Sequence, residues 1–344
     1  MMYEESMMYE ESRPRHCSDQ SYPPKVSRQL RATLCAVALT LLTAGSAGAE
    51  QIWFAPPDNL PRGGNVLVTD FDDLFGPAAD WSGALSHIDV FEITPRYSFA
   101  APEDSMKKVL AVLAQHHVKV AIAMQAAEKR PDCGYGLESM TPPGGAAGIM
   151  RHMKKVNADL AIVSYDEPLY FSHFFTGPQS CQYDLPALVD ALAPSAKAIM
   201  EAYPNAIIGE SEPVSTTLPA NWLQDLSKYL DLYQAKVGKP LAFIHADISW
   251  KTNWQPQLRQ LRDLLKSKHV ELGVIYNAPG PGDSDEAWVA EATRNIDAVR
   301  TALGGLPDEA VIKSWTKHPS HILPETSPGA LADVLREYLA RNKH

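Results

Sequence analysis

Short apolar runs alternate with segments of helical periodicity along most of the chain. The helical segments carry apolar residues three and four positions apart, as Met106, Val109, Leu110 and Leu113 do, which is the spacing of one helix face. The pattern predicts strands at residues 65–70, 87–94, 118–124, 159–165, 206–210, 241–248, 271–276 and 310–315. It predicts helices at residues 102–116, 145–156, 185–203, 221–237, 254–268, 285–303 and 329–341.

This order of elements indicates a parallel sheet. Alternating strands and helices are joined by right-handed crossovers in such sheets. Eight strand–helix units favour a closed barrel over an open, doubly wound sheet. Neither GxGxxG nor GxxxxGK[ST] follows the first predicted strand, which argues against a nucleotide-binding fold. We therefore expect a single-domain α/β (β/α)8 TIM barrel over residues 50–344.

The amino-terminal segment has the composition of an export signal. Arg28 and Arg31 precede an apolar run at residues 32–42, and the small residues Ala47-Gly48-Ala49 follow. This order is typical of a signal peptide that is cleaved near Ala49. The alternative is a membrane anchor, but the apolar run is shorter than the roughly 20 residues of a membrane span. Residues 1–49 are therefore interpreted as an N-terminal extension and signal peptide of a secreted or periplasmic protein, with no membrane span left after cleavage.

Charge and cysteine content narrow the choice of partners. The formal charge is −10, and residues 1–49 contain as many acidic as basic residues, so the predicted barrel carries the negative charge. A chain without a basic stripe is not expected to bind nucleic acid. Cys133 and Cys181 lie in the predicted barrel, and an even pair in an oxidising compartment predicts a disulfide. The alternative is two free thiols. Oligomeric state does not follow from the sequence.

Polar and aromatic residues gather at the carboxyl ends of the predicted strands, where such barrels carry their active sites. Aromatic rings stack on sugar faces, and carboxylate, amide and imidazole groups hydrogen-bond to hydroxyls, so these residue types favour a carbohydrate substrate. The candidate substrate-binding residues are Asp70, Glu92, Gln125, Asp166, Tyr170, His245, Trp250, Tyr276, Asn277 and Trp315.

The most informative motif is Asp166-Glu167-Pro168, at the end of the fourth predicted strand. It resembles the Asn-Glu-Pro of clan A glycoside hydrolases, in which the Glu is the general acid/base. The resemblance implies that Glu167 donates a proton to a glycosidic oxygen and that Asp166 takes the place of the Asn. It covers these three residues and the strand order.

One position departs from the clan A pattern. Clan A enzymes carry a nucleophilic Glu at the end of the seventh strand, where this chain has Tyr276-Asn277-Ala278. Glycoside cleavage normally needs one protonated and one ionised carboxyl group. The candidates for the second group are Glu210 and Glu212 on the fifth predicted strand, with Asp247 on the sixth in reserve.

Three functions are consistent with these residues. The first is a glycoside hydrolase or transglycosylase that acts on an oligo- or polysaccharide through Glu167. The second is a noncatalytic carbohydrate-binding barrel, which the missing carboxylate of the seventh strand favours. The third is a metal-dependent hydrolase or lyase that uses the acids at the strand ends. The histidines lack HExxH spacing and there is no EF-hand loop, so we expect neither a metal nor another cofactor.

Overall fold

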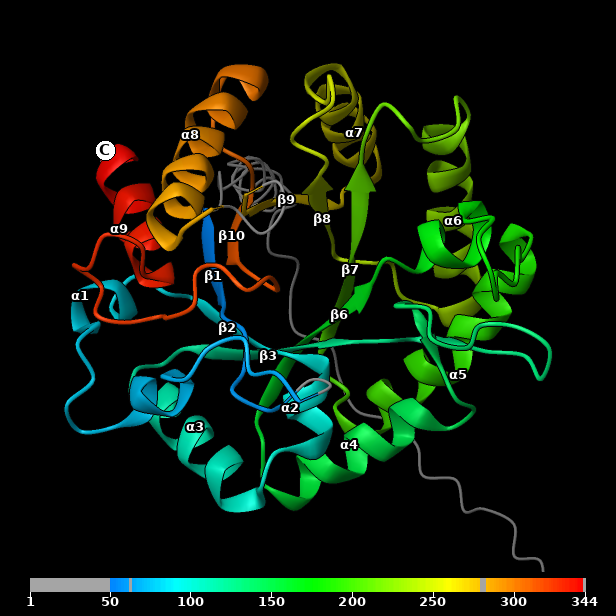
Figure 1. Ribbon diagram of the computed structural model, residues 1–344. Coiled ribbons are helices and arrows are strands. Elements are labelled where there is room, and N and C mark those ends of the chain that lie inside the picture. The colour runs from blue at the N-terminus through cyan, green and yellow to red at the C-terminus, as the bar shows by residue number, and fades with distance from the viewer. Residues whose placement is uncertain (1–49, 62–63, 279–282, 343–344) are drawn as a thin grey trace, which may run out of the picture. The chain divides into compact units, whose positions relative to one another are not determined.

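Eight parallel strands close into a barrel in the order β1, β2, β3, β6, β7, β8, β9, β10 (Figure 1). The computed structural model describes residues 50–61, 64–278 and 283–342. The predicted signal peptide therefore lies outside the described residues. The barrel strands are β1 (Gln51–Ala55), β2 (Val90–Ile93), β3 (Lys119–Met124), β6 (Leu160–Asp166), β7 (Ile207–Val214), β8 (Phe243–Ile248), β9 (Glu271–Tyr276) and β10 (Glu309–Lys313).

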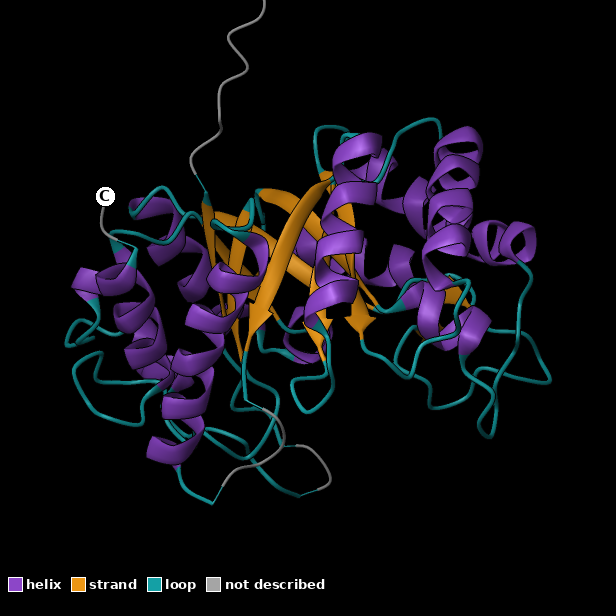
Figure 2. Cartoon of the chain, turned by 90° about the horizontal axis from the view of Figure 1, so that it is seen from above, coloured by secondary structure: helices purple, strands orange, loops and turns teal. Residues whose placement is uncertain are grey.

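Helices surround the strands on the outside of the barrel (Figures 1 and 2). They are α1 (Ser82–Leu85), α2 (Pro95–Ala100), α3 (Glu103–Gln115), α4 (Gly145–Lys155), α5 (Leu185–Ala202), α6 (Trp222–Val237), α7 (Gln255–Lys268), α8 (Asp285–Leu303) and α9 (Leu331–Arg341). A 3-10 turn, η1 (Phe71–Phe75), a π turn, η2 (Tyr170–Phe174), and a small sheet of β4 (Ala127–Glu128) and β5 (Met140–Thr141) complete the described elements. The predicted (β/α)8 barrel is confirmed. No helix in this part of the chain is both long and apolar enough to cross a lipid bilayer.

The helix boundaries follow from capping residues. Asp184 accepts a hydrogen bond from the Ala187 amide at the start of α5, and Ser284 accepts one from the Ala287 amide at the start of α8. Such side chains satisfy amides that have no partner within the helix. Helix α8 ends at Gly304, whose φ of 68° suits glycine.

Alternate residues of each strand point into the barrel, as the two-residue repeat of a strand requires. The interior holds an apolar layer of Trp53, Ala55, Val90, Ala121, Ile162, Phe243, Ile275 and Val311. Gly209 leaves room for the Phe243 ring, because a Cβ at that position would lie 2.5 Å from ring atoms. A larger apolar core fills the space between the sheet and the helices.

The first strand is not where the sequence pattern placed it. We predicted a strand at residues 65–70, whereas β1 is Gln51–Ala55, which pairs with β10 on one side and β2 on the other. Trp53 packs inside the barrel and Phe54 packs outward against Trp81 and Phe91. Residues 65–70 form no barrel strand, and they belong to the connection between β1 and β2.

The predicted disulfide between Cys133 and Cys181 is present. It joins the segment between β4 and β5 to the segment that follows η2, two stretches 48 residues apart in the sequence. Both stretches follow barrel strands at their carboxyl ends. The disulfide therefore ties together two of the loops beside the site described next.

Candidate active site

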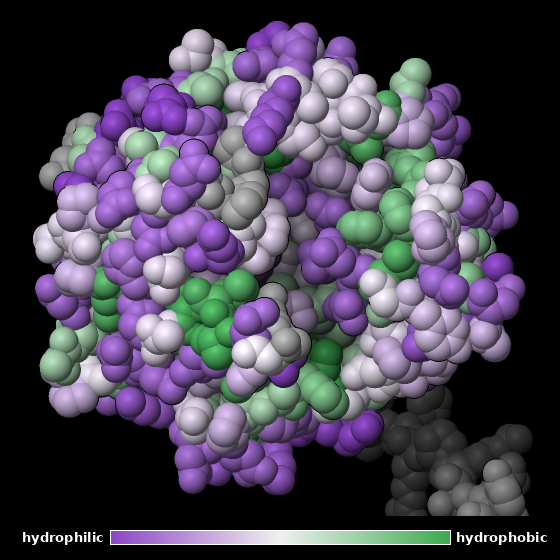
Figure 3. Space-filling view, in the orientation of Figure 1, coloured by the Kyte–Doolittle hydropathy of each residue, from purple (hydrophilic) through white to green (hydrophobic). Residues whose placement is uncertain are grey.

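A cavity of about 480 Å³ opens at the carboxyl ends of the strands. In Figure 2 the strand arrowheads point to the end of the barrel where the longer loops gather, and Figure 3 shows a hollow near the middle of this face. Strand ends and adjoining loops supply all of its walls. The lining residues are Ala55, Glu92, Thr94, Pro95, Ala123, Glu138, Asp166, Glu167, Ser211, Asp247, Ile275, Lys313, Ser314 and Trp315.

Asp166 and Glu167 both line this cavity although they are consecutive residues. On a regular strand, consecutive side chains point to opposite faces. Asp166 is the last residue of β6, and Glu167 has left-handed backbone geometry with a φ of 45°. This conformation is uncommon for residues other than glycine and occurs often at functional sites. It turns the chain so that both carboxyl groups reach the same space.

Glu167 and Asp247 both line the cavity, and each shifts the pKa of the other. Burial, followed by the charges of Asp247 and Asp166, raises the pKa of Glu167 well above its usual value. Burial also raises the pKa of Asp247 to about 6, although Lys313, Glu167 and Asn277 oppose the rise. Burial and neighbouring negative charge therefore favour the protonated form of Glu167, whereas Lys313 favours the ionised form of Asp247.

Lys313 lies on the opposite wall and forms an ion pair with Glu92, with 2.7 Å between Nζ and Oε1. Burial alone would lower the pKa of Lys313, but Glu92, Asp166 and Asp247 outweigh it and raise that pKa. The lysine is thus a fixed positive charge. The pKa of Asp166 is raised, chiefly by burial, while Lys313 opposes the rise.

Glu210 and Glu212 do not line the cavity, which corrects our expectation that one of them partners Glu167 there. Both occupy positions of β7 that alternate with the cavity-lining Ser211. Glu210 Oε2 accepts a 2.7 Å hydrogen bond from the Tyr229 hydroxyl of α6. Glu212 accepts hydrogen bonds of 2.6 and 3.0 Å from the amides of Leu169 and residue 170. Of the three candidates for the second carboxyl group, only Asp247 lines the cavity with Glu167. Burial, then the charges of Glu210 and Glu167, raise the pKa of Glu212, which lies behind the cavity wall.

His245 and Asp70 were also expected to contact substrate, and the structure places them elsewhere. His245 is buried inside the barrel below the cavity, where Nε2 lies 2.6 Å from Glu309 Oε2 and the ring stacks on Phe243. Asp70 Oδ2 accepts hydrogen bonds of 2.8 and 2.9 Å from the amides of residues 322 and 323. Asp70 therefore anchors the loop that contains residues 322 and 323, and it does not stand at the end of a barrel strand.

The remaining candidates for substrate binding divide into residues that line the cavity or an adjoining hollow and residues that line neither. Trp315, which is 42% exposed, lines the cavity. Trp250 and Asn277 line an adjoining hollow of about 350 Å³ that shares Asp247 and Trp315 with it, and the Trp250 indole nitrogen donates a hydrogen bond to Asn277 Oδ1. Tyr276 instead packs against Tyr338 of α9, so its predicted role is wrong. Two further candidates, Gln125 and Tyr170, line neither space.

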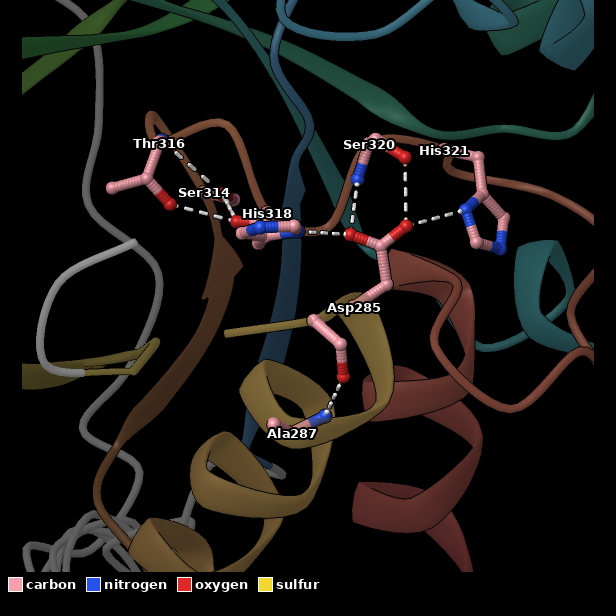
Figure 4. Close-up of polar contacts among 8 residues, drawn as sticks. Asp285, Ala287, Ser314, Thr316, His318, Ser320 and His321 are labelled. Atoms are coloured by element: carbon pink, nitrogen blue, oxygen red, sulfur yellow. Dashed lines mark hydrogen bonds and ion pairs between the residues drawn. The ribbon is translucent and has the colours of Figure 1, made fainter. Parts of the chain in front are cut away.

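Asp285 fixes the loop that carries Trp315 (Figure 4). It belongs to the first turn of α8 and accepts hydrogen bonds from the Ser320 amide at 2.9 Å and the Ser320 hydroxyl at 2.7 Å. The Nδ1 atoms of His318 and His321 also hydrogen-bond to it. Burial alone would raise the pKa of Asp285, but the hydrogen bonds with His318 and Ser320 outweigh it and lower that pKa.

The sequence reasoning missed two charged residues of the cavity, Glu138 and Lys313. Lys313 could have been found from the two-residue repeat of β10, since Val311 faces the barrel interior and Lys313 is two positions later. Glu138 lies in an irregular segment between β4 and β5 at the rim, where no pattern marks it. Within the described ranges, no group of three or more His, Cys, Asp or Glu side chains is arranged to hold a metal ion.

Comparison with known proteins identifies the fold. No protein-family model and no curated protein matches this sequence. Among solved structures, the chain is similar to a GH10 protein from Paenibacillus barcinonensis, at 13% identity and a TM-score of 0.50, over 78% of this chain and 84% of that one. It is also similar to CbXyn10B, at 11% identity and a TM-score of 0.50, over 84% of this chain and 96% of the other.

A third similar structure is a glucosidase from Croceicoccus marinus, at 10% identity and a TM-score of 0.47 over 76% of this chain. The chain spans 59% of the length of that glucosidase. At such identities the similarity establishes a shared barrel architecture, which many unrelated activities use. The function therefore has to be argued from the cavity itself.

Proposed function

We propose that this protein is an exported glycoside hydrolase or transglycosylase in which Glu167 is the general acid and Asp247 is its carboxylate partner. The observation that carries the proposal is that Glu167 and Asp247 line the same cavity at the strand ends. Acid catalysis of glycoside cleavage needs one carboxyl group that keeps its proton and one that has lost it. The raised pKa of Glu167, caused first by burial, supports this division of roles.

The surroundings of the pair suit a sugar. Trp315 offers an exposed ring at the wall. Ser211, Ser314 and Thr94 also line the cavity, and their hydroxyl groups donate hydrogen bonds within the protein, so their oxygens serve as acceptors. We expect the substrate to bind beside the two carboxyl groups, so that Glu167 donates to the glycosidic oxygen while Asp247 stays ionised.

Replacement of Glu167 by Gln tests the proposal. Gln has nearly the shape of a protonated Glu but cannot donate a proton, so we expect turnover of a responsive oligosaccharide to fall by about 10²–10⁴-fold. The thermal unfolding temperature should stay near that of the wild type. The experiment screens a panel of bacterial and plant glycans, with the exposed Glu201→Gln variant of α5 as a matched control.

A second substrate sharpens the test. A glycoside whose leaving group departs as a stable anion, such as a dinitrophenyl glycoside, needs little proton donation and should lose much less activity in Glu167→Gln. Wild-type rates for this variant on natural glycans would contradict the role of Glu167.

The second candidate function is noncatalytic carbohydrate binding. It is favoured by the end of β9, where Ile275 faces the cavity and no carboxylate follows. In that case a glycan should raise the unfolding temperature of the wild type, stay uncleaved after long incubation, and bind equally well to Glu167→Gln.

A further inference from the structure

Negative charge in the cavity exceeds what an acid and its carboxylate partner require. The described part of the cavity wall carries one cationic side chain, Lys313. The acidic side chains that line it are Glu92, Glu138, Asp166, Glu167 and Asp247. When Glu167 keeps its proton, the remaining acids still outnumber the lysine, so the cavity favours a ligand with positive charge.

Glu92 adds an independent observation, because one of its oxygen atoms is left without a partner. Its side chain is 2% exposed, and Oε1 is taken up by Lys313. Oε2 is buried and has no hydrogen-bond partner among the described residues. A buried acceptor without a donor is destabilising, and it is the kind of group that a ligand donor satisfies.

The other acids show the same imbalance. Partial burial, followed by the charges of Asp166 and Asp247, raises the pKa of Glu138 at the rim. Burial also raises the pKa of Asp166, where Lys313 opposes the rise and Glu92 adds to it. Each of these carboxylates would gain from a nearby cation. An anionic sugar such as a uronate would be repelled by the same groups.

An ammonium group fits this arrangement better than a metal ion does. The described acids are not arranged as a metal site. An ammonium group carries three N–H donors, which can be shared among acceptors on different walls. The acceptors here come from β2, from the end of β6, from β8 and from the rim segment before β5.

We propose that the sugar bound in this cavity carries a free, positively charged amino group, as an unacetylated hexosamine does, and that Glu92 and Asp166 recognise it. The inference rests on the proposed glycoside chemistry at the same site. It adds a substrate class, and it can be measured by binding alone, separately from cleavage.

Binding to the Glu167→Gln variant tests the proposal without turnover. The ligands are the methyl glycosides of glucosamine, N-acetylglucosamine, glucose and glucuronic acid, and the equivalent galactose series, each in both anomers. We expect the amine to bind at least about tenfold more tightly than the acetamide and the hydroxyl in at least one series, and the uronate to bind most weakly. Calorimetry at neutral pH measures this order.

Salt and pH should change the preference in a defined direction. High salt screens charge, so the advantage of the amine should shrink. It should also shrink as the pH falls below about 6, because Asp247 takes up a proton. The charged groups that face the ligand are the five acids named above and Lys313.

Two variants locate the effect. Asp166→Asn should lower the ratio of amine affinity to neutral glycoside affinity severalfold, and Glu201→Gln should leave that ratio unchanged. Glu92→Gln should act in the same direction, although it also removes the partner of Lys313. Asp166→Asn therefore keeps the proposal testable if Glu92→Gln fails to fold.

Three outcomes would overturn the inference: equal affinity for amine, acetamide and hydroxyl, stabilisation by Ca²⁺ or Mg²⁺ alone that matches the amine, or no binding of any glycoside. The last of these would also remove the glycoside function. Tight binding of the amine without cleavage by the wild type would instead leave this inference standing and favour the noncatalytic candidate.

Discussion

At the scale of single residues, environment separates acids that look alike in the sequence. Glu167, Glu210 and Glu212 all follow apolar strand segments, and the apolar pattern by itself does not show which of them reach the cavity. In the structure the first reaches the cavity through its left-handed backbone, and the other two point to the outer side of β7. The sequence did show that positions 210 and 212 share a face. It could not show which face is inward, because that depends on Gly209 making room for the Phe243 ring of the neighbouring strand β8.

Glu210 yields a prediction about stability and pH. Burial raises its pKa to about 8, although the hydrogen bond from Tyr229 opposes the rise. Since the folded pKa exceeds the unfolded one, this group's contribution is fully present below about pH 4.3 and is lost as the pH rises through about 8. We expect the wild-type unfolding temperature to fall over this range more steeply than that of Glu210→Gln.

Thermal unfolding at several pH values from 4 to 9 checks this expectation, with Glu201→Gln as the exposed control. The two curves should diverge most above pH 8, where the wild type has to ionise a buried carboxyl group. Parallel curves for the wild type and Glu210→Gln would show that Glu210 ionises freely in the folded protein.

At the scale of elements, periodicity predicted the helices well and the loops poorly. Helices α5 and α8 begin at the capping residues Asp184 and Ser284, as their local sequence indicates. Strand β1 was missed because its buried run is short and a second apolar segment follows it. The cavity rim depends on long-range contacts, such as the four groups that hydrogen-bond to Asp285 from the loop after β10. Such contacts leave no periodic signal.

Asp285→Asn tests the importance of that loop anchor. A hydrogen bond to a charged acceptor contributes about 1.5–3 kcal/mol to stability. We therefore expect the variant to lose about 1–3 kcal/mol of unfolding free energy at pH 7. Burial opposes the shift, but His318 and Ser320 lower the folded pKa of Asp285. The difference in unfolding free energy between the wild type and the variant should therefore be present above about pH 4 and be lost at lower pH.

Chemical denaturation at pH 7 and pH 3 measures the difference. Asp263→Asn is the matched control, because Asp263 is exposed and forms an ion pair with the neighbouring Arg262. An Asp285→Asn variant as stable as the wild type at pH 7 would mean that the loop holds its position without this anchor.

At the scale of the whole molecule, closure of the barrel turns a scattered set of acids into a site. Asp247 and Glu167 lie on strands separated by β7, and Lys313 and Glu92 come from opposite ends of the chain. The alternation of strands and helices was sufficient to predict the barrel and the face that carries the cavity. It was not sufficient to predict which inward side chains meet, because that depends on strand order and register together.

The central claim is that Glu167 keeps a proton beside an ionised Asp247 at neutral pH. Infrared difference spectroscopy between the wild type and Glu167→Gln at pH 7 tests it most directly, because protonated and ionised carboxyl groups absorb at separate frequencies. We predict that the band lost in the variant belongs to a protonated carboxyl group, and that it shifts when Asp247 is replaced by Asn. Loss of a carboxylate band instead would contradict the account.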